Sequence, residues 1–314
     1  MGAAHLWHSD AVADAPAAEV DVTVGLVRSL LRAQHPDLAA LPLSLVANGW
    51  DNAVLRLGED LAVRAPRRAA AARLVRHEQE WLPRIAPTLP VAVPVPVRAG
   101  RPTTSYPWAW SVVPWFEGVD AIDVPRAGRG PAAPALAAFV GALHRPAPRD
   151  APHNPVRGVP LLARDAVVRE RIASGLVPDA ARTASLWSRL VAVPPWAGPP
   201  VWLHGDLHPG NLLLAPPGAP PRPDGPLRAV VDFGDLTAGD PATDLATAWL
   251  TFDDDARATF RAAVTVACGT DDDTWARARG WALCLGTALV AHSDDSPRYA
   301  ELGASTLRAV LASA

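Results

Sequence analysis

Two stretches decide the fold, HGDLHPGN at residues 204–211 and VVDFGD at residues 230–235. The first is rich in Gly and Pro and is bordered by short apolar runs, which predicts a loop between strands. Asp206 and Asn211 lie five residues apart on this loop, and Asp232 follows the next apolar run. A carboxylate such as Asp206 can accept the proton of an attacking hydroxyl. Because an amide oxygen and a second carboxylate are hard ligands that suit Mg²⁺, the pattern indicates phosphoryl transfer.

The spacing matches the H-R-D-x-x-x-x-N and D-F-G pattern of kinases, with Gly205 in place of Arg. An Asp and an Asn at this spacing are a weak signal alone, but D-F-G begins 21 residues after Asn211. His204 and His208 also flank Asp206 as His-x-Asp-x-His, a spacing that metallohydrolase clusters share. That alternative leaves Asn211 and the D-F-G segment unexplained, so the kinase-like site is the main hypothesis.

The regions on either side of the loop differ in their predicted elements. Upstream, short apolar runs predict strands at residues 43–46, 53–57, 61–64, 91–98 and 108–115, and composition predicts a helix at 69–82 that ends near Pro83. Downstream of Pro131, helical spacing predicts helices at 132–143, 161–173, 184–193, 242–252, 255–268, 273–292 and 297–312.

These elements predict an α+β chain of two lobes, a small β lobe followed by a larger, mostly helical lobe. The kinase-like motifs imply the two-lobed protein-kinase-like fold, with an antiparallel sheet in the small lobe. We expect residues 1–18 to be a flexible tail and residues 19–117 to form the β-rich lobe that binds a nucleotide. Residues 118–314 are then the helical lobe, with the catalytic loop and the substrate site. Ligands of such an arrangement bind in the cleft between the lobes.

Composition excludes several classes of function. The chain has 314 residues, enough for about two domains. With 49% hydrophobic and 19% charged residues, it is not disordered. Its net charge of −3 argues against a nucleic-acid partner, which requires clustered positive charge. All 29 basic residues are Arg, so mechanisms that use a Schiff-base lysine or a P-loop lysine are excluded.

The sequence gives no sign of a membrane partner. Residues 1–20 lack the basic start and the apolar run of a signal peptide. The longest apolar stretch, residues 281–291, is shorter than the ~20 residues that span a bilayer. We therefore expect a cytoplasmic protein, and nothing in the sequence indicates its oligomeric state.

Together with GDPATDLA at residues 239–246, the two motifs resemble the aminoglycoside phosphotransferase family of kinase-like enzymes. The resemblance extends from about Leu43 to the C-terminal helices and is more specific for the fold than for the substrate. It implies that Asp206 is the catalytic base and that Asn211 and Asp232 are Mg²⁺ ligands. ATP or GTP is the implied phosphoryl donor.

The resemblance also assigns nucleotide-binding residues in the β lobe. Where the family has a lysine on its third strand, this chain has Arg64, and Glu78 is the implied partner, with Glu80 as the alternative. Arg keeps the positive charge but is longer than Lys and forked. The family's phosphate-covering turn corresponds here to a turn that contains Asn48, Gly49 and Asn52.

The family's hinge between the lobes falls in residues 112–118, and backbone groups there are expected to meet the nucleotide base. Pro114 has no N–H and can only accept a hydrogen bond. The expected pair is therefore the carbonyl of Pro114 and the N–H of Phe116, with Val113 and Trp115 as the alternative pair.

Acidic residues concentrate in the second part of the chain. Residues 201–314 carry 8 Arg and 15 acidic residues, whereas residues 1–200 carry 21 Arg and 17 acidic residues. Many of the acids bunch at 253–255, 271–273 and 294–295, where they either cap helices or form an acidic wall for a cationic substrate. Capping is the main interpretation for each cluster, but the resemblance implies that at least one cluster receives the substrate. We expect Asp294 and Asp295 to do so, and Asp235 either to face the acceptor or to serve as a turn residue.

The leading hypothesis is an O-phosphotransferase that acts on a small cationic antibiotic such as an aminoglycoside. A kinase for a choline-, homoserine- or sugar-type metabolite, or for a macrolide, fits the same motifs. A catalytically inactive binding module would explain Arg64 and the atypical turn, but not the intact Asp206, Asn211 and Asp232. A protein kinase is disfavoured because no A-P-E motif follows D-F-G.

Overall fold

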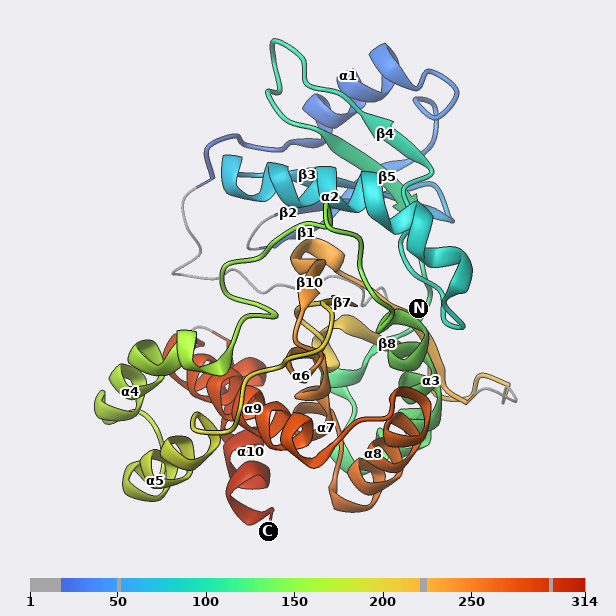
Figure 1. The fold of residues 1–314 in the computed structure, drawn as a ribbon. Coiled ribbons are helices and arrows are strands. Elements are labelled where there is room, and N and C mark those ends of the chain that lie inside the picture. The colour runs from blue at the N-terminus through green and yellow to red at the C-terminus, as the bar shows by residue number, and fades with distance from the viewer. Residues whose placement is uncertain (1–17, 50–51, 221–224, 294–295, 314) are drawn as a thin grey trace.

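The computed structural model describes residues 18–49, 52–220, 225–293 and 296–313. A small lobe built around one sheet sits on a larger helical lobe (Figure 1). This arrangement confirms the predicted two-lobed α+β fold. No helix in the described ranges is long and apolar enough to cross a membrane. The expected N-terminal tail lies, apart from residue 18, outside the described residues.

The small lobe contains one antiparallel sheet in the order β1-β2-β3-β5-β4. Its elements are α1 (Val24–Gln34), β1 (Leu43–Asn48), β2 (Asn52–Leu57), β3 (Leu61–Pro66), α2 (Ala69–Ile85), β4 (Arg98–Gly100) and β5 (Trp110–Pro114). Because side chains alternate across a strand, Leu55 and Val63 pack with Leu30 of α1 on one face. Val54 and Ala62 lie on the other face beside Val113.

Helix α2 runs through Pro83 to Ile85, three residues beyond the predicted end. A proline in the last turn removes only one hydrogen bond, and burial of Trp81, Leu82 and Ile85 compensates for it. The predicted strand at 91–98 is wrong. Only Arg98–Gly100 pairs in the sheet, since Pro94 and Pro96 have no N–H to donate to a neighbouring strand.

The large lobe contains two short antiparallel sheets, ordered β6-β8-β9 and β10-β7, among helices. Its elements are β6 (Val119–Asp120), α3 (Ala133–Leu143), α4 (Asp165–Ala173), α5 (Ala180–Leu190), β7 (Val201–Leu203), β8 (Leu212–Leu214), β9 (Leu227–Val230), β10 (Thr237–Gly239), α6 (Ala242–Leu245), α7 (Thr247–Thr251), α8 (Asp254–Cys268), α9 (Asp272–His292) and α10 (Pro297–Ala312). The predicted helix at 242–252 is two short helices, although Ala246 between them keeps helical dihedrals.

Aromatic side chains fill the core of the large lobe. Phe139, Trp187, Trp249, Phe260 and Trp281 are all at most 2% exposed and belong to one apolar cluster. Helix α9 is buried along most of its length, and Figure 1 shows it among the other helices of the lobe. Such a core supports the short strands β7, β8 and β9, which border the two motif-bearing loops.

Strand pairing brings the two deciding motifs together. The loop at 204–211 connects β7 to β8, and Asp232 follows directly on β9 and Val231. Since β8 and β9 are antiparallel neighbours, the end of the loop lies beside the start of the D-F-G segment. The N–H of Val231 donates to the carbonyl of Asn211 at 2.9 Å.

Candidate active site

A buried carboxylate braces the loop at 204–211 from below. Asp244, on α6, is fully buried and accepts hydrogen bonds from the N–H of His204 at 2.8 Å and of Gly205 at 2.9 Å. His144 lies 3.2 Å from the same carboxylate. Because two backbone donors and a histidine surround Asp244, its role is to hold the loop and not to react.

His204 fixes the next residue of the loop. Its Nε2 lies 2.9 Å from the carbonyl of Val231, and its Nδ1 lies 3.2 Å from the N–H of Asp206. A carbonyl can only accept and an N–H can only donate, so the ring must be neutral with its proton on Nε2. This arrangement makes His204 a structural residue, which leaves no role for it as a metal ligand.

Gly205 allows the loop to pass close to the D-F-G segment. Its φ is +87°, and a Cβ at this position would lie 2.2 Å from the carbonyl oxygen of Asp235. Any side chain there would collide with backbone. The glycine that replaces the usual kinase Arg is therefore required by this close approach.

Asp206 lies between two positively charged or chargeable groups. Its Oδ1 is 3.1 Å from Nη2 of Arg157, and its Oδ2 is 3.3 Å from Nε2 of His208. Burial raises the pKa of the Asp206 carboxyl, but His208 and Arg157 together hold that pKa well below its usual range. Asp206 is therefore ionised at neutral pH, as an acceptor of a proton must be.

Asn211 and Asp232 offer oxygen atoms beside Asp206. The amide nitrogen of Asn211 donates to the carbonyl of Asp206 at 2.8 Å, which leaves its amide oxygen for a ligand. Asp232 adopts a left-handed conformation (φ 62°) and keeps 47% of its side chain exposed. Within the described residues, no three His, Cys, Asp or Glu side chains form a metal cluster. One carboxylate and one amide oxygen fit Mg²⁺, which keeps several waters and shares phosphate oxygens.

Arg64 links the two lobes. Its Nη1 contacts both carboxylate oxygens of Glu78 at 2.8 and 3.0 Å, so the expected ion pair forms and the alternative, Glu80, instead faces Arg84 at 3.7 Å. Its Nη2 also contacts Oδ1 of Asp232 at 3.0 Å. Burial raises the pKa of Glu78 and Arg64 lowers it. The contact with Asp232 uses the second arm of a fork that lysine lacks.

The turn between β1 and β2 is closed by a hydrogen bond from the N–H of Gly49 to the carbonyl of Asn52 at 2.9 Å. Arg67 donates to the carbonyl of Gly49 at 3.0 Å. The buried amide oxygen of Asn52 has no hydrogen-bond partner among the described residues. Asn48 is the last residue of β1. Hydrogen bonds to Gly49 from Arg67 and to Asn52 from Gly49 thus hold the two ends of the turn next to the sheet.

The linker between the lobes follows β5. The N–H of Trp115 donates to the carbonyl of Asp60 at 2.7 Å, so it is already used inside the small lobe. The N–H of Phe116 has no acceptor in the described part of the chain. Of the two backbone pairs expected for a nucleotide base, the carbonyl of Pro114 and the N–H of Phe116 is therefore the pair that this geometry favours.

Apolar side chains from both lobes surround this linker. Trp115 packs against Val54, Ala62 and Val113 of the small lobe. Trp115 and Phe116 also pack against a cluster of Leu213, Ala229 and Val231 in the large lobe. Apolar side chains from both lobes beside the N–H of Phe116 suit a flat heteroaromatic base.

Three side chains at the site were missed by the sequence analysis. Arg157 contacts Asp206, as described above, and Asn154 donates to Oδ1 of Asp235 at 2.7 Å. The ring of Tyr299 packs edge-on against His208 at 5.8 Å between centroids. Burial raises the pKa of Tyr299 to about 12, so its hydroxyl stays protonated. None of the three belongs to a motif, and nothing in their spacing marked them.

Two of the three acidic clusters cap helices. Asp253 and Asp271 cap α8 and α9 through hydrogen bonds to Ala256 and Thr274, which confirms the capping interpretation for these two clusters. Asp294 and Asp295 lie outside the described residues. Asp235 is described, and both burial and Asp206 raise the pKa of its carboxyl.

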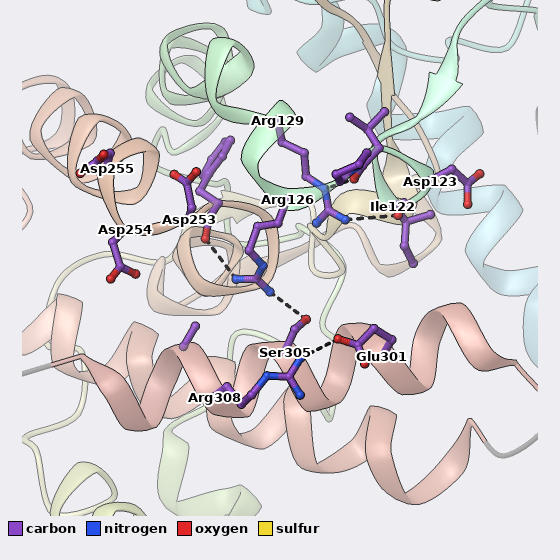
Figure 2. Close-up of a pocket in the computed structure, with 14 residues that line it drawn as sticks. Ile122, Asp123, Arg126, Arg129, Asp253, Asp254, Asp255, Glu301, Ser305 and Arg308 are labelled. Carbon is purple, nitrogen blue, oxygen red and sulfur yellow. Dashed lines mark hydrogen bonds and ion pairs between the residues drawn. The ribbon is translucent and has the colours of Figure 1, made fainter.

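The cluster at 253–255 faces a separate cavity of about 870 Å³, shown in Figure 2. Residues 122–126, Arg129, residues 252–255 and α10 line it, and no residue of the loop at 204–211 does. Two arginines of this cavity, the half-buried Arg126 and the buried Arg129, donate to backbone carbonyls: Arg126 to those of Trp249 and Phe252, and Arg129 to those of Val124 and Thr251. These arginines connect the end of α7 to residues 124–129.

The site therefore brings the ionised Asp206, the amide of Asn211 and the carboxylate of Asp232 together beside Arg64 of the small lobe, an arrangement like that of kinase-like phosphotransferases. The sequence model of the phosphotransferase enzyme family (APH) matches residues 42–281, and the chain belongs to that family. No protein of curated function matches the chain in sequence.

Solved structures share the fold of this chain. The GDP complex of wild-type aminoglycoside 2′-phosphotransferase-IIIa superposes with a TM-score of 0.65 at 17% identity, over 93% of this chain and 99% of that one. A macrolide 2′-phosphotransferase from Brachybacterium faecium gives 0.57 at 21% identity, over 90% and 97%. ADP-bound aminoglycoside phosphotransferase APH(2″)-Ib gives 0.54 at 14% identity, over 92% and 99%. At these identities the comparison establishes the fold.

Proposed function

We propose that this phosphotransferase moves the γ-phosphate of ATP or GTP, with Mg²⁺, to a hydroxyl of a small cationic antibiotic of the aminoglycoside type. The observation that carries the proposal is the convergence of Asp206, Asn211 and Asp232 where the large lobe meets Arg64 of the small lobe. The backbone of Asn211 bonds to Val231, and its side chain bonds to Asp206, so the three residues form one connected unit.

Asp206 accepts the proton of the acceptor hydroxyl. A carboxylate whose pKa is held low is a weak base, which suits a loose phosphoryl-transfer transition state in which the proton leaves late. The position of Asp206 then matters more than its basicity. The side chains of His204 and Asn211 hold the backbone N–H and carbonyl of Asp206.

Asn211 and Asp232 would hold Mg²⁺, which neutralises phosphate charge when bound. Arg64 lies on the small-lobe side of the same carboxylate and places a permanent positive charge above it. In a chain without lysine, Arg64 is the cation for the α- and β-phosphates. We assign the base to the cleft at Val113, Pro114, Trp115 and Phe116.

The acceptor belongs on the side of Asp206 that faces Asp235 and Tyr299. We keep Asp235, Asp294 and Asp295 as candidate partners for a substrate amine. A macrolide is the second candidate acceptor, because structures of macrolide 2′-phosphotransferases share the fold at TM-scores of 0.57 and 0.59. A macrolide carries fewer amines and more apolar surface than an aminoglycoside, so the two classes separate readily in a screen.

A transfer assay with γ-labelled ATP and GTP tests the proposal. The panel contains aminoglycosides, macrolides, choline, homoserine and simple sugars, each with and without Mg²⁺. We expect label on an aminoglycoside or a macrolide, only with Mg²⁺, and none with Asp206→Ala. Label on a metabolite alone would replace the proposed substrate class. Failure of the wild type to bind Mg²⁺-nucleotide would refute the enzymatic assignment of these residues.

A further inference from the structure

Arg157 bridges the two carboxylates nearest to the site of the acceptor. Its Nη2 is 3.1 Å from Oδ1 of Asp206, and its Nε is 3.9 Å from Oδ2 of Asp235. The arginine comes from the segment after α3, about fifty residues before the catalytic loop, and only 19% of its side chain is exposed. An arginine buried against two carboxylates is tightly restricted in orientation.

The segment that carries Arg157 is pinned to the D-F-G side of the site. Asn154 accepts hydrogen bonds from the N–H groups of Val156 and Arg157 at 2.9 and 3.1 Å, and it donates to Asp235 at 2.7 Å. Such an Asx turn sets the backbone immediately before the guanidinium. The segment therefore does not depend on Asp206 for its position.

Gly158 anchors the other end of the segment. Its N–H donates to Thr243 at 3.0 Å, and its carbonyl accepts from the N–H of Asp240 at 3.0 Å. Its φ is +67°, and a Cβ there would lie 2.8 Å from Leu203. A segment fixed at both ends presents Arg157 as a rigid donor to Oδ1 of Asp206, while the other carboxylate oxygen lies 3.3 Å from Nε2 of His208.

We propose that Arg157 is a positioning residue for phosphoryl transfer, which holds the Asp206 carboxylate in the orientation that accepts the hydroxyl proton. This inference rests on the proposed function. One arm of the guanidinium restrains Asp206, while Nε has no hydrogen-bond acceptor among the described residues. Asp235 lies against Nε of Arg157, so the positive charge of the guanidinium is shared between Asp206 and Asp235.

Kinetics of Arg157 variants distinguish positioning from simple stabilisation. We expect Arg157→Ala to lower kcat by about 100-fold, the loss that misplacement by an ångström produces. The nucleotide Kd should change by less than about threefold, because Arg157 contacts Asp206 and Asp235 and none of the residues assigned to the nucleotide. Arg157→Lys should recover part of kcat, and added guanidinium should partly rescue Arg157→Ala.

The matched control is Arg169→Ala, which removes an arginine from an exposed pair with Asp165 at 2.8 Å on α4. It should leave kcat unchanged. Wild-type kcat in Arg157→Ala, or a higher one, overturns the proposal. A loss of kcat that parallels a fall in Tm and that guanidinium does not restore overturns it as well.

A second measurement needs no acceptor. Thermal unfolding of Arg157→Ala, Asp206→Ala and the double variant forms a cycle for the two side chains. Coupled effects support the restraint, and additive effects overturn it. If the wild type transfers phosphate to no acceptor, the proposed function fails, and the cycle still decides whether Arg157 restrains Asp206.

Discussion

Replacing Arg64 by Ala should both destabilise the protein and weaken its hold on the nucleotide. The guanidinium is 2% exposed and contacts Glu78 at 2.8 and 3.0 Å and Asp232 at 3.0 Å. Its removal leaves Glu78, itself 1% exposed, without its cationic partner. Breaking a buried pair in this way costs about 3–5 kcal/mol, which we expect to lower Tm by about 6 °C or more.

The sign of the pH dependence follows from Glu78. Burial already raises its pKa, and without Arg64 that pKa rises further. When the pKa of a carboxyl is higher in the folded state than in the unfolded state, the protein loses folding stability as pH rises from the unfolded-state pKa to the folded-state pKa. Arg64→Ala should therefore be less destabilised, relative to the wild type, at pH 5.5 than at pH 8. The double variant Arg64→Met with Glu78→Leu should regain most of the stability, since no charge remains unpaired.

Nucleotide binding provides the second readout of the same change. We expect Arg64→Ala to raise the nucleotide KM about tenfold or more, which corresponds to about 1.4 kcal/mol. Arg64→Lys should be partly active, because the charge survives while the fork does not. Differential scanning fluorimetry at both pH values and kinetics at saturating acceptor measure these effects. An Arg64→Ala protein with wild-type Tm and wild-type KM would refute the role of this pair.

Three further changes test the remaining parts of the site. Asp206→Ala should abolish transfer with an unchanged nucleotide Kd by calorimetry, and more than a few per cent of residual kcat contradicts the assignment. Asn211→Ala and Asp232→Ala should each raise the Mg²⁺ concentration for half-maximal activity, with Asp232 the larger effect; titrations that match the wild type count against both ligands. Gly205→Ala should lower Tm and kcat together, since its Cβ would lie 2.2 Å from the carbonyl of Asp235 and its φ of +87° is strained, at about 1–3 kcal/mol. A normally active, stable Gly205→Ala would show that the loop and Asp235 are not in such close approach.

The fold was predictable because its signals are local. The catalytic loop and D-F-G are contiguous motifs, and the C-terminal helices have clear periodicity, so α10 was predicted residue for residue at 297–312. The error at 91–98 arose because valines favour strands while the prolines between them cannot donate. The alternation of side chains predicted a strand without taking into account that Pro94 and Pro96 have no N–H to donate.

The site was only partly predictable, because some of its contacts are long-range. The Arg64–Glu78 pair joins neighbouring elements 14 residues apart and could be expected from the resemblance. The contacts from Arg64 to Asp232 and from Arg157 to Asp206 span 168 and 49 residues. Arg157 sits in a loop without periodicity, where one arginine among 29 carries no distinguishing signal. Only the folded arrangement of the segment reveals it.

Transfer of label from γ-³²P-nucleotide is the most direct test of the central claim. The wild type, incubated with Mg²⁺ and the acceptor panel, should place the label on a hydroxyl of an aminoglycoside or a macrolide, and Asp206→Ala should place none. Equal labelling by the wild type and by Asp206→Ala would contradict the account, because the reaction would then not depend on the residue around which the site is built.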